Sequence, residues 1–499
     1  MVLNEKQRQI GKDNFGDAAK ISRRQVLTGA LAIPTAASIY WGYDKLKGNP
    51  VRTGLIGTGN QGCYAHISQS NPDYIDIVAI SDIRPSNQER ARKLLNEKYG
   101  AKAKDVKLYV DYMDMINDPD IELIIVALPL HLHKHATIEA MKAGKHVLCE
   151  KLMAKTVEEC KEMVRAADET KKLLSIGHQR HYSYLYANAL SIMQQGILGD
   201  VRAIRAFWHR NQTAGGAEGA KEGAFDSWRP GVPAADRDID YAKFGYVSLE
   251  QLIQWRLDNR TGGGLMVELG SHQLDAISIF LNKAHPQSVQ GIGKVSFFND
   301  GRDVFDHVHL LYDFGEDANN TVVGYSSICT NAFDVYGEQV MGTKGTMIIQ
   351  AEQNAYLFKE GANALDTRVP YADYLASQDP NKDTHITWAE QRLERPTMDS
   401  GSTAAWASGI EAAETMTSRG YREEQEHLAW LIRNPDAIQL PSQENPMPKD
   451  GVPRCHGRIA LIDAAITLAS NLAMEKKKSV EFKPEWFDPY SPSVPENEV

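Results

Sequence analysis

The sequence predicts an α/β domain built on a doubly wound parallel sheet, followed by an α+β domain with a mostly antiparallel sheet. Three observations support this order. An apolar run enters a glycine-rich turn within residues 51–62, apolar runs and helical stretches alternate up to residue 178, and strand-like segments then follow one another between residues 201 and 350. The chain has 499 residues, which is too long for one ordinary core, so at least two domains are expected.

We assign residues 49–178 to the first domain. Apolar runs in it have the length and composition of strands buried in a parallel sheet. Helical stretches, among them 137–144 and 157–171, separate these runs, and such short crossovers produce a doubly wound sheet. The runs occupy residues 51–56, 75–81, 106–110, 121–128, 146–150 and 173–177.

The first of these strands leads into a turn with the sequence GTGNQG. A glycine turn lets the backbone approach a pyrophosphate, and the helix that follows directs free N–H groups and the positive end of its dipole toward it. Asp82 closes the next apolar run, where a carboxylate can accept hydrogen bonds from both ribose hydroxyls of an adenosine. This spacing predicts a bound dinucleotide, and the alternative is a tight turn without a ligand. The turn residues are Gly57, Gly59, Asn60, Gln61 and Gly62.

We assign residues 179–485 to the second domain and residues 486–499 to a C-terminal tail. Strand-like segments in this domain follow one another with few helices between them, which favours an antiparallel or mixed sheet. The predicted helices are expected to pack on one face of that sheet. The strand-like segments are 201–210, 287–298, 306–314, 320–329 and 333–350, and the helices are 184–195, 265–281, 421–433 and 455–475. Two segments fit neither pattern, namely 212–260 and 351–420, and such long segments are usually functional loops or partner arms.

Residues 1–48 are expected to lie outside the fold, as an export signal and linker. Arg23 and Arg24 precede a weakly apolar run at residues 26–41, which is too short to cross a bilayer as a helix. A long polar lead, paired arginines and a mild apolar stretch resemble a twin-arginine export signal. The pattern predicts a periplasmic or extracytoplasmic protein, with an uncleaved membrane tether as one form of it. The alternative is a disordered tail on a cytoplasmic protein.

The composition argues against several classes of partner and site. The formal net charge is −10 and no basic stripe accompanies it, so nucleic acid is not expected as a partner. Five cysteines are scattered without a CxxC pair, so neither a metal cluster nor a disulfide framework is expected. Three alternating histidines at positions 131, 133 and 135 are a weak metal signal without an acidic partner. We therefore predict no metal site.

A second strong signal lies in residues 262–281, where three glycines lead into a helix that is apolar almost all round. Glu268, His272 and Asp275 interrupt this surface at positions i, i+4 and i+7, so they are expected to share one face. Burying ionisable groups costs free energy unless they are paired or functional, so this polar line is a candidate catalytic site. The alternative is an internal polar network, with Glu268 complementing the helix N-terminus.

The carboxyl ends of three predicted strands carry further candidates, because ligands bind at this edge of open α/β sheets. Glu150 and Lys151 end the fifth strand, where a lysine can contact nicotinamide and substrate together. The segment PLHLH at residues 129–133 ends the fourth strand. Arg180 and Tyr182 follow the sixth strand and are candidates for binding polar substrate atoms or, alternatively, for contacts at a domain hinge.

These motifs together resemble the Gfo/Idh/MocA family, which is named for glucose–fructose oxidoreductase and inositol dehydrogenase. The resemblance covers residues 50–485 and depends on GTGNQG, ALPLHLH, AGKHVLCEK, GHQRHY and GGGLMVELGSHQLD, with GTKGT at 342–346 and PRC at 453–455 as further matches. It implies a second domain with an open sheet that often mediates assembly into homodimers or homotetramers.

The resemblance also implies catalytic roles. Lys151 matches the lysine of the family's E-K-P motif, with Leu152 in place of the proline. Glu268 and His272 match the family's D-x-x-x-H pair, with glutamate in place of aspartate. The implied catalytic residues are therefore Lys151, His272 and Glu268.

The implied coenzyme is NAD, because Asp82 matches family members that prefer NAD, although Arg84 leaves NADP open. Coenzyme contacts are expected from Gly57, Gly59, Asn60, Gln61, Gly62, Asp82, Arg84, Leu128, Pro129, His131, His133, Glu150, Lys151 and Gln179. Contacts with a small carbohydrate substrate are expected from Arg180, Tyr182, Trp255, Arg256 and Asp275.

We expect an exported oxidoreductase that acts on the CH–OH group of a sugar, polyol or glycoside, with tightly held NAD or NADP. His272 is expected to take the hydroxyl proton, Lys151 to stabilise the alkoxide, and Glu268 or Asp275 to orient His272. The aromatic-rich segment 212–260 is expected to supply a stacking surface for a sugar ring. Two alternatives belong to other classes, namely a glycosidase that uses NAD transiently and a non-catalytic sugar sensor.

Overall fold

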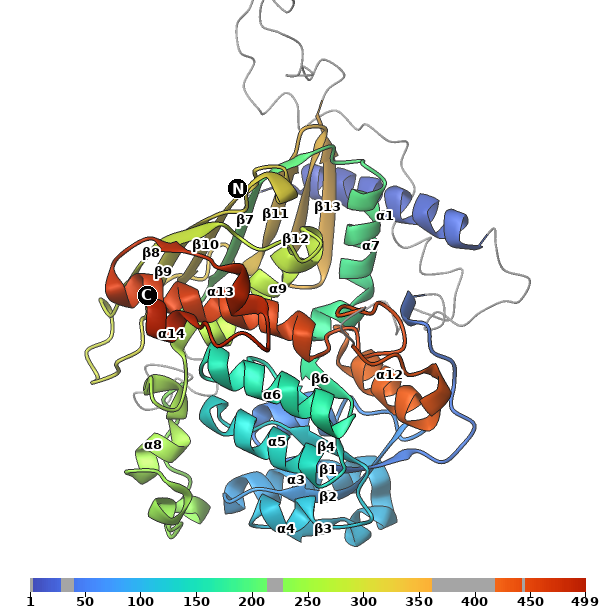
Figure 1. Cartoon of the computed structure of the whole chain (residues 1–499), viewed down its shortest axis with the longest axis vertical. Helices are drawn as coiled ribbons and strands as arrows, with labels where there is room; N and C mark the ends of the chain where they lie inside the picture. The colour runs from blue at the N-terminus through green and yellow to red at the C-terminus, as the bar shows by residue number, and fades with distance from the viewer. Residues whose placement is uncertain (1–2, 28–39, 213–227, 361–417, 442–444) are drawn as a thin grey trace, which may run out of the picture.

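The computed structural model of the chain describes residues 3–27, 40–212, 228–360, 418–441 and 445–499, and for residues 20–27 it describes the backbone alone. Figure 1 shows a smaller sheet with its helices below and a larger sheet above. Most of the irregular segment 351–420 and most of the apolar run 26–41 lie outside the described residues.

The first domain contains a six-stranded sheet in which every neighbouring pair is parallel, with the order β3-β2-β1-β4-β5-β6. This order confirms the predicted doubly wound sheet. Its strands are β1 (Val51–Ile56), β2 (Ile75–Ser81), β3 (Lys107–Tyr109), β4 (Leu123–Val126), β5 (His146–Glu150) and β6 (Leu174–Gly177). Its helices are α3 (Pro85–Tyr99), α4 (Tyr112–Ile116), α5 (His133–Lys142) and α6 (Val157–Thr170), with short η1 (Gly62–Ile67), η2 (Gly100–Asp105) and η3 (Leu130–Leu132).

Local sequence explains where the longer helices of this domain begin. Pro85 occupies the first turn of α3, where its missing N–H costs nothing. The hydroxyl of Thr156 accepts a hydrogen bond from the Glu159 N–H at 3.1 Å and caps α6. Strand β4 is buried along its whole length, as expected for a strand covered on both faces.

The second domain contains an eight-stranded sheet with the order β13-β12-β11-β7-β10-β9-β8-β14. The pairing of β7 with β10 is parallel and the other pairings are antiparallel, so the prediction of a mostly antiparallel sheet is confirmed. Its strands are β7 (Val201–His209), β8 (Ser288–Lys294), β9 (His307–Asp313), β10 (Val322–Ile328), β11 (Tyr336–Gly342), β12 (Gly345–Gln350), β13 (Asn354–Lys359) and β14 (Val480–Glu481).

Helices cover one face of this sheet, and part of the other face is open. The covering helices are α7 (Tyr184–Gln194), α9 (Ser271–Phe280) and α13 (Gly457–Lys476), and α13 also packs on α6 of the first domain (Figure 1). On the opposite face of β8, β9 and β10, Ile292, Leu311 and Val322 are each at least half exposed. Apolar side chains in this number on one flat face are typical of a surface that contacts another protein.

Helix α12 (Tyr421–Arg433) does not pack where it was expected. The sequence analysis placed it on the sheet of the second domain, but it covers the parallel sheet of the first (Figure 1). Its Leu428 and Leu431 are fully buried against Val51 and Leu55 of β1. The helix was predicted at the correct residues, but the apolar side of a helix does not specify which of two sheets it covers.

The described parts of the N-terminal segment pack on the fold, which corrects for them the expectation that residues 1–48 lie outside it. Helix α1 (Glu5–Leu27) runs along the edge strand β13 and contacts α7. The Asn14 side chain donates to the Leu357 carbonyl at 3.0 Å, and Phe15 is buried in the core. A helix in this place covers an otherwise unpaired sheet edge. Further along, Trp41 and Tyr43 are buried on the first domain.

Within the described residues, α13 is the one helix long and apolar enough to span a membrane. However, 78% of its apolar window is buried between the second sheet and the first domain. Its apolar surface is therefore explained by the protein core.

Candidate active site

A cavity of about 840 Å³ lies between the two domains. The first domain contributes the glycine turn and the carboxyl ends of β2, β4 and β5. The second contributes the end of β7, parts of the segment 228–256 and the turn before α9, and Tyr421 of α12 also lines it. The predicted site residues that line it are Gly57, Gly59, Asn60, Gln61, Asp82, Arg84, Leu128, Pro129, His133, Glu150, Lys151, Trp255, Arg256, Glu268 and His272.

The three glycines of the turn meet three different steric demands. Gly57 has φ +88°, and a Cβ there would collide with the Ala127 carbonyl oxygen. A Cβ at Gly62 would collide with the carbonyl oxygen of Gly57, whereas a Cβ at Gly59 would project into open space beside the cavity. Gly57 and Gly62 therefore shape the turn, and Gly59 leaves room for a ligand. This is the arrangement that a pyrophosphate requires.

Asp82 is held rigidly at the end of β2. Its Oδ2 accepts a hydrogen bond from the Thr58 N–H at 2.8 Å and from Asn87 at 3.1 Å, and its Oδ1 accepts one from the Arg84 N–H at 2.8 Å. Burial raises the pKa of Asp82, and these hydrogen bonds oppose that effect. Oδ1 keeps a lone pair, so a ribose hydroxyl can donate to it.

Glu150, at the end of β5, ties this edge of the sheet to the glycine turn. Its Oε1 accepts hydrogen bonds from Gln61 and from His66 Nε2, each at 2.8 Å. Burial raises the pKa of Glu150, but the bonds from His66 and Gln61 outweigh it and leave the pKa below its ordinary value. Glu150 therefore supports the coenzyme cradle as an ionised carboxylate.

His133 is a fixed structural group. Its two ring nitrogens lie 2.8 Å from the carbonyl oxygens of Leu128 and Leu152, and only a protonated ring can donate to both. Burial lowers its pKa, but Cys149 and the two carbonyls raise it to about 9. The ring thus joins the loops that follow β4 and β5.

Lys151 extends from the end of β5 toward the second domain. Its Nζ donates to the Glu268 carbonyl at 2.8 Å and lies 3.4 Å from that of Val267, both in η8 (Met266–Gly270). Burial lowers its pKa, against the opposing charges of Glu268 and Glu150. The Lys151–Leu152 peptide bond is cis. An ammonium group in this place can donate its remaining N–H groups to a ligand in the cavity.

His272 lies on the cavity wall at the start of α9. Burial, followed by the charges of Lys151 and Arg180, holds its pKa well below the ordinary value, so the ring is neutral near pH 7. Its Nδ1 is buried without a hydrogen-bond partner among the described residues, which leaves Nε2 as the nitrogen that faces the cavity. The ring of Trp208 lies 5.4 Å away, centroid to centroid.

Glu268 lines the same cavity but does not contact His272. Its Oε2 accepts a hydrogen bond from Arg256 Nε at 2.6 Å. The guanidinium of Arg256 in turn lies 4.1 Å over the Trp255 ring. Glu268 therefore fixes a basic side chain of the cavity, and the expectation that it orients His272 is not met by this geometry.

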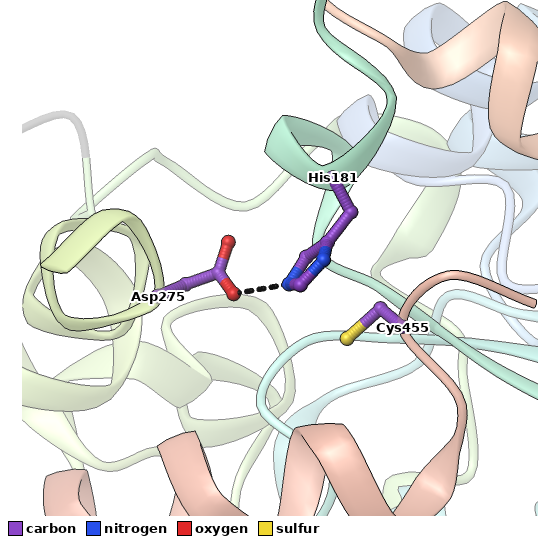
Figure 2. A group of neighbouring side chains, drawn as sticks. All are labelled: His181, Asp275 and Cys455. Carbon is purple, nitrogen blue, oxygen red and sulfur yellow. Dashed lines mark hydrogen bonds and ion pairs between the residues drawn. The ribbon is translucent and has the colours of Figure 1, made fainter. Parts of the chain in front are cut away.

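Asp275 does not line the cavity with Glu268 and His272, which corrects the prediction of one polar face. The π-helix over Met266–Gly270 ends before His272, so it shifts Glu268 relative to α9 but not His272 relative to Asp275. Figure 2 shows Asp275 bonded to His181, at 2.7 Å from Oδ1 to Nε2, with Cys455 beside them. Asp275 therefore neither orients His272 nor reaches the substrate.

The cluster of His181, Asp275 and Cys455 has atoms close enough to hold a metal ion, all within 4.8 Å of one another. Lys283 already supplies a positive charge there. Its Nζ lies 3.3 Å from His181 Nε2 and 3.7 Å from Asp275 Oδ1. The cluster is therefore explained as a buried ion-pair network between the domains.

Arg180 and Tyr182 are buried away from the cavity, which corrects their assignment to the substrate. Arg180 pairs with Glu338 at 2.9 Å and with Glu352 at 2.8 Å, and it donates to the His272 carbonyl at 2.5 Å. Arg180 therefore positions the backbone of His272. The Tyr182 hydroxyl bonds His427 and accepts from the Arg454 N–H, each at 2.8 Å.

Besides Gly62 of the turn, two predicted coenzyme residues do not line the cavity. His131 contacts the Thr261 carbonyl at 3.3 Å, and its ring lies edge-on to Tyr246. Gln179 is buried beneath the start of α12, where its backbone lies against Gly420. Each follows a strand end, but its side chain does not line the cavity.

Sequence reasoning missed several cavity residues, among them Trp208 and Arg210, whereas Trp228 belongs to the predicted aromatic segment 212–260. Trp208 stacks on Tyr336 at 4.3 Å, and the Arg210 guanidinium lies 5.4 Å over the Trp208 ring. Both residues come from the end of β7 and point to the same side because they are two residues apart. That alternation was visible in the sequence, but nothing in it indicated which face of β7 borders the cavity.

Comparison with known families identifies both halves of the chain. A Gfo/Idh/MocA model described as an oxidoreductase family with an NAD-binding Rossmann fold matches residues 51–178. A second, described as the C-terminal alpha/beta domain of that oxidoreductase family, matches residues 237–430. These matches confirm the resemblance, the predicted fold class and a nicotinamide dinucleotide as the coenzyme.

Among similar proteins, scyllo-inositol 2-dehydrogenase (NADP(+)) IolW of Bacillus subtilis is 27% identical over 273 residues, 54% of this chain and 62% of that protein. A glycosyl hydrolase family 109 protein of Shewanella baltica is 28% identical over 204 residues, 38% of this chain and 44% of that protein. The matched region thus spans less than two thirds of either. The crystal structure of aldose-aldose oxidoreductase from Caulobacter crescentus has a TM-score of 0.55 at 17% identity, covering 87% of this chain and all of that one.

Proposed function

Because this chain belongs to the Gfo/Idh/MocA family of oxidoreductases, we propose that it transfers a hydride between a CH–OH group of a sugar or polyol and NAD. The observation that carries the proposal is one continuous cavity. It has a glycine cradle and an adenosine-binding carboxylate at one end, and Lys151 and His272 at the other. The relatives named above that act on inositols and aldoses support this substrate class.

In this proposal His272 is the general base. Its neutral ring accepts the substrate hydroxyl proton at Nε2, and its depressed pKa keeps that nitrogen unprotonated near pH 7. Lys151 donates a hydrogen bond to the substrate oxygen and stabilises the negative charge that develops on it. Bound NAD would supply the hydride acceptor, held by the Gly59 turn and Asp82.

The other cavity residues orient the substrate. Trp208, Trp228 and Trp255 present ring surfaces on which a sugar ring can stack, and Arg210 and Arg256 are placed to bond its oxygens. Only part of the predicted aromatic segment is used in this way. Its residues 213–227 lie outside the described part of the chain.

The test is a comparison of two histidine variants. NADH formation is followed by absorbance with a panel of sugars and polyols, for wild type, His272→Ala and His309→Ala. His309 is an exposed histidine on the open face of β9 and serves as the matched control. We expect His272→Ala to lower kcat by about 10²- to 10⁴-fold and His309→Ala to leave it unchanged. Equal turnover in the two variants would contradict the proposal.

A glycosidase that uses NAD transiently is the second candidate, supported by the similarity to a glycosyl hydrolase family 109 protein. Such an enzyme oxidises a sugar hydroxyl, eliminates the aglycone, adds water and reduces the product, so it consumes no coenzyme. Purified protein is incubated with chromogenic glycosides without added NAD. Release of the chromophore favours this candidate, and its absence with active hydride transfer favours the oxidoreductase.

We also propose that the chain assembles through the open face of its second sheet into a homodimer or homotetramer. The support is the exposed apolar surface formed by Ile292, Leu311 and Val322. Sedimentation of wild type and Leu311→Glu measures the mass of the assembly. A monomeric wild type would contradict this proposal.

Export through a twin-arginine signal, with or without a membrane tether, is a further proposal. It is supported by Arg23 and Arg24 at the C-terminal end of α1. Fractionation of cells that express wild type or the variant Arg23→Lys/Arg24→Lys tests it. An extracytoplasmic wild type and a retained variant are the expected results.

A further inference from the structure

A carboxylate from the second domain is bound at the N-terminus of α3 in the first. Asp236 belongs to η5 (Ala234–Asp236) and is fully buried. It accepts hydrogen bonds from Arg84 Nε at 2.9 Å, from the Ser86 N–H at 2.9 Å and from the Ser86 hydroxyl at 2.6 Å. Figure 1 shows the segment around α8 (Leu249–Ile253), which includes η5, extending down beside the first domain.

The donors that hold Asp236 form a set suited to a phosphate group. They are a guanidinium, an N–H group from the first turn of a helix and a hydroxyl. Helix N-termini bind phosphates because their N–H groups are unpaired and the helix dipole favours a negative charge there. Arginine adds charged hydrogen bonds that match phosphate oxygens.

The position of this donor set relates it to the coenzyme. Arg84 lies two residues after Asp82, and both line the part of the cavity where the Asp82 carboxylate is placed to bind the adenosine ribose. In dinucleotide-binding domains an arginine near this ribose accommodates the 2′-phosphate that distinguishes NADP from NAD. Arg84 and Ser86 are thus placed to receive a 2′-phosphate, and both are already bonded to Asp236.

We propose that Asp236, which is bonded to Arg84 of the cavity wall, takes the place of a 2′-phosphate and thereby makes the enzyme select NAD over NADP. It acts in two ways. It neutralises the charge of Arg84, and its own charge repels a phosphate at the same place. Asp82, which lines the same part of the cavity, adds to that repulsion.

The ionisation of Asp236 supports this assignment. Burial raises the pKa of its carboxyl, but the hydrogen bonds from Ser86 and Arg84 outweigh burial and leave the pKa below its ordinary value. The group is therefore charged near pH 7. The inference rests on the proposed dinucleotide and not on the proposed substrate.

The experiment measures binding of NAD⁺ and NADP⁺ by calorimetry to protein stripped of dinucleotide. We expect Asp236→Ala to bind NADP⁺ at least about tenfold more tightly than wild type, because Arg84 and Ser86 become free to donate to the phosphate. NAD⁺ affinity should change by less than about threefold, because that coenzyme places no charge at this position. Asp236→Ala should also bind adenosine 2′,5′-bisphosphate more tightly than wild type by a similar factor, whereas its affinity for 5′-AMP should not rise.

Two further variants separate the proposed effect from general electrostatics. Asp238→Asn removes an exposed carboxylate from the same segment and should leave both affinities unchanged. Arg84→Gln in the Asp236→Ala background should abolish the gain, because the main phosphate donor is then absent.

The outcomes are distinguishable. If Asp236→Ala does not fold, the isosteric variant Asp236→Asn is measured instead. We expect it to raise NADP⁺ affinity as well, by a smaller factor. Unchanged NADP⁺ affinity with intact NAD⁺ binding, or an equal gain in Asp238→Asn, would overturn the inference. A wild-type protein that binds neither dinucleotide would instead overturn the proposed coenzyme.

Discussion

The coenzyme half and the substrate half of the cavity are built in opposite ways. In the coenzyme half, Asp82, Glu150 and Asp236 each accept at least two hydrogen bonds from fixed partners. In the substrate half, His272 Nδ1 has no partner among the described residues, and the Arg210 guanidinium contacts an aromatic ring. The groups left for a bound substrate are the other ring nitrogen of His272, Nε2, and the N–H groups of Arg210. The coenzyme half is preorganised, whereas the substrate half is completed by its ligand.

The comparison predicts that the two halves can be disabled separately, and after His272→Ala the largest effect is expected at Lys151. Lys151→Met should lower kcat by about 10²- to 10³-fold, because the developing alkoxide loses a charged donor. NAD affinity should change little, because the coenzyme half keeps its own network. Stopped-flow hydride transfer and calorimetric NAD binding measure the two effects. A parallel loss of NAD binding would show that the halves are not independent.

The second prediction concerns stability in acid, because two buried histidines that do not line the cavity have lowered pKa values. Burial holds the pKa of His178 at about 4 and that of His456 at about 3. In the unfolded chain both titrate near the ordinary value of about 6.5, so the stability they contribute is full above that pH. It is lost as the pH falls toward the folded values, by about 1.4 kcal/mol per pH unit for each histidine.

Thermal unfolding between pH 7 and pH 5 measures this loss. His456→Gln should flatten the pH dependence, since it removes one of the groups that must take up a proton on unfolding. In the coenzyme half, the contribution of His133 to stability changes with pH in the opposite direction, because the pKa of His133 is raised to about 9. Its contribution is full below about 6.5 and is lost as the pH rises through 9. A stability that stays constant from pH 7 to pH 5 would contradict this account.

The third prediction distinguishes the glycine that leaves room for the coenzyme from a glycine that the fold of the turn requires. Gly59→Ala should weaken NAD binding at least about tenfold, because the new methyl group enters the space left for the pyrophosphate. The melting temperature without coenzyme should be unchanged, since nothing lies within 4 Å of that Cβ. Gly62→Ala is the contrast, because its Cβ collides with the Gly57 carbonyl and should destabilise the fold. Equal destabilisation by both would contradict these roles.

The same contrast explains how much the sequence could predict. The coenzyme half depends on local motifs, in which Gly57, Gly59 and Asp82 have fixed spacing, so the sequence indicated where its glycine turn and acidic residue lie. Asp275 was misplaced because its partner His181 lies 94 residues away in the chain, and helical spacing does not specify which buried group a carboxylate binds. Asp236 was missed because it meets Arg84 across 152 residues of chain. Contacts of that range depend on how the two domains pack, which periodicity does not specify.

The smallest expected effect is at Arg210. It tests whether the polar groups of the substrate half form their hydrogen bonds with the bound substrate. Arg210→Gln should raise KM about tenfold, because a charged hydrogen bond to a substrate oxygen contributes about 1.5 kcal/mol or more. Its removal should leave both kcat and NAD affinity nearly unchanged, since Arg210 contacts neither Lys151 nor the glycine turn in the bonds described. Arg210→Lys should recover part of the loss, because it restores the charge but not the planar fork. Arg202→Gln, which removes an exposed arginine of the same strand, is the control. If Arg210→Gln instead weakened NAD binding, Arg210 would belong to the preorganised half and the division of the cavity would be drawn in the wrong place.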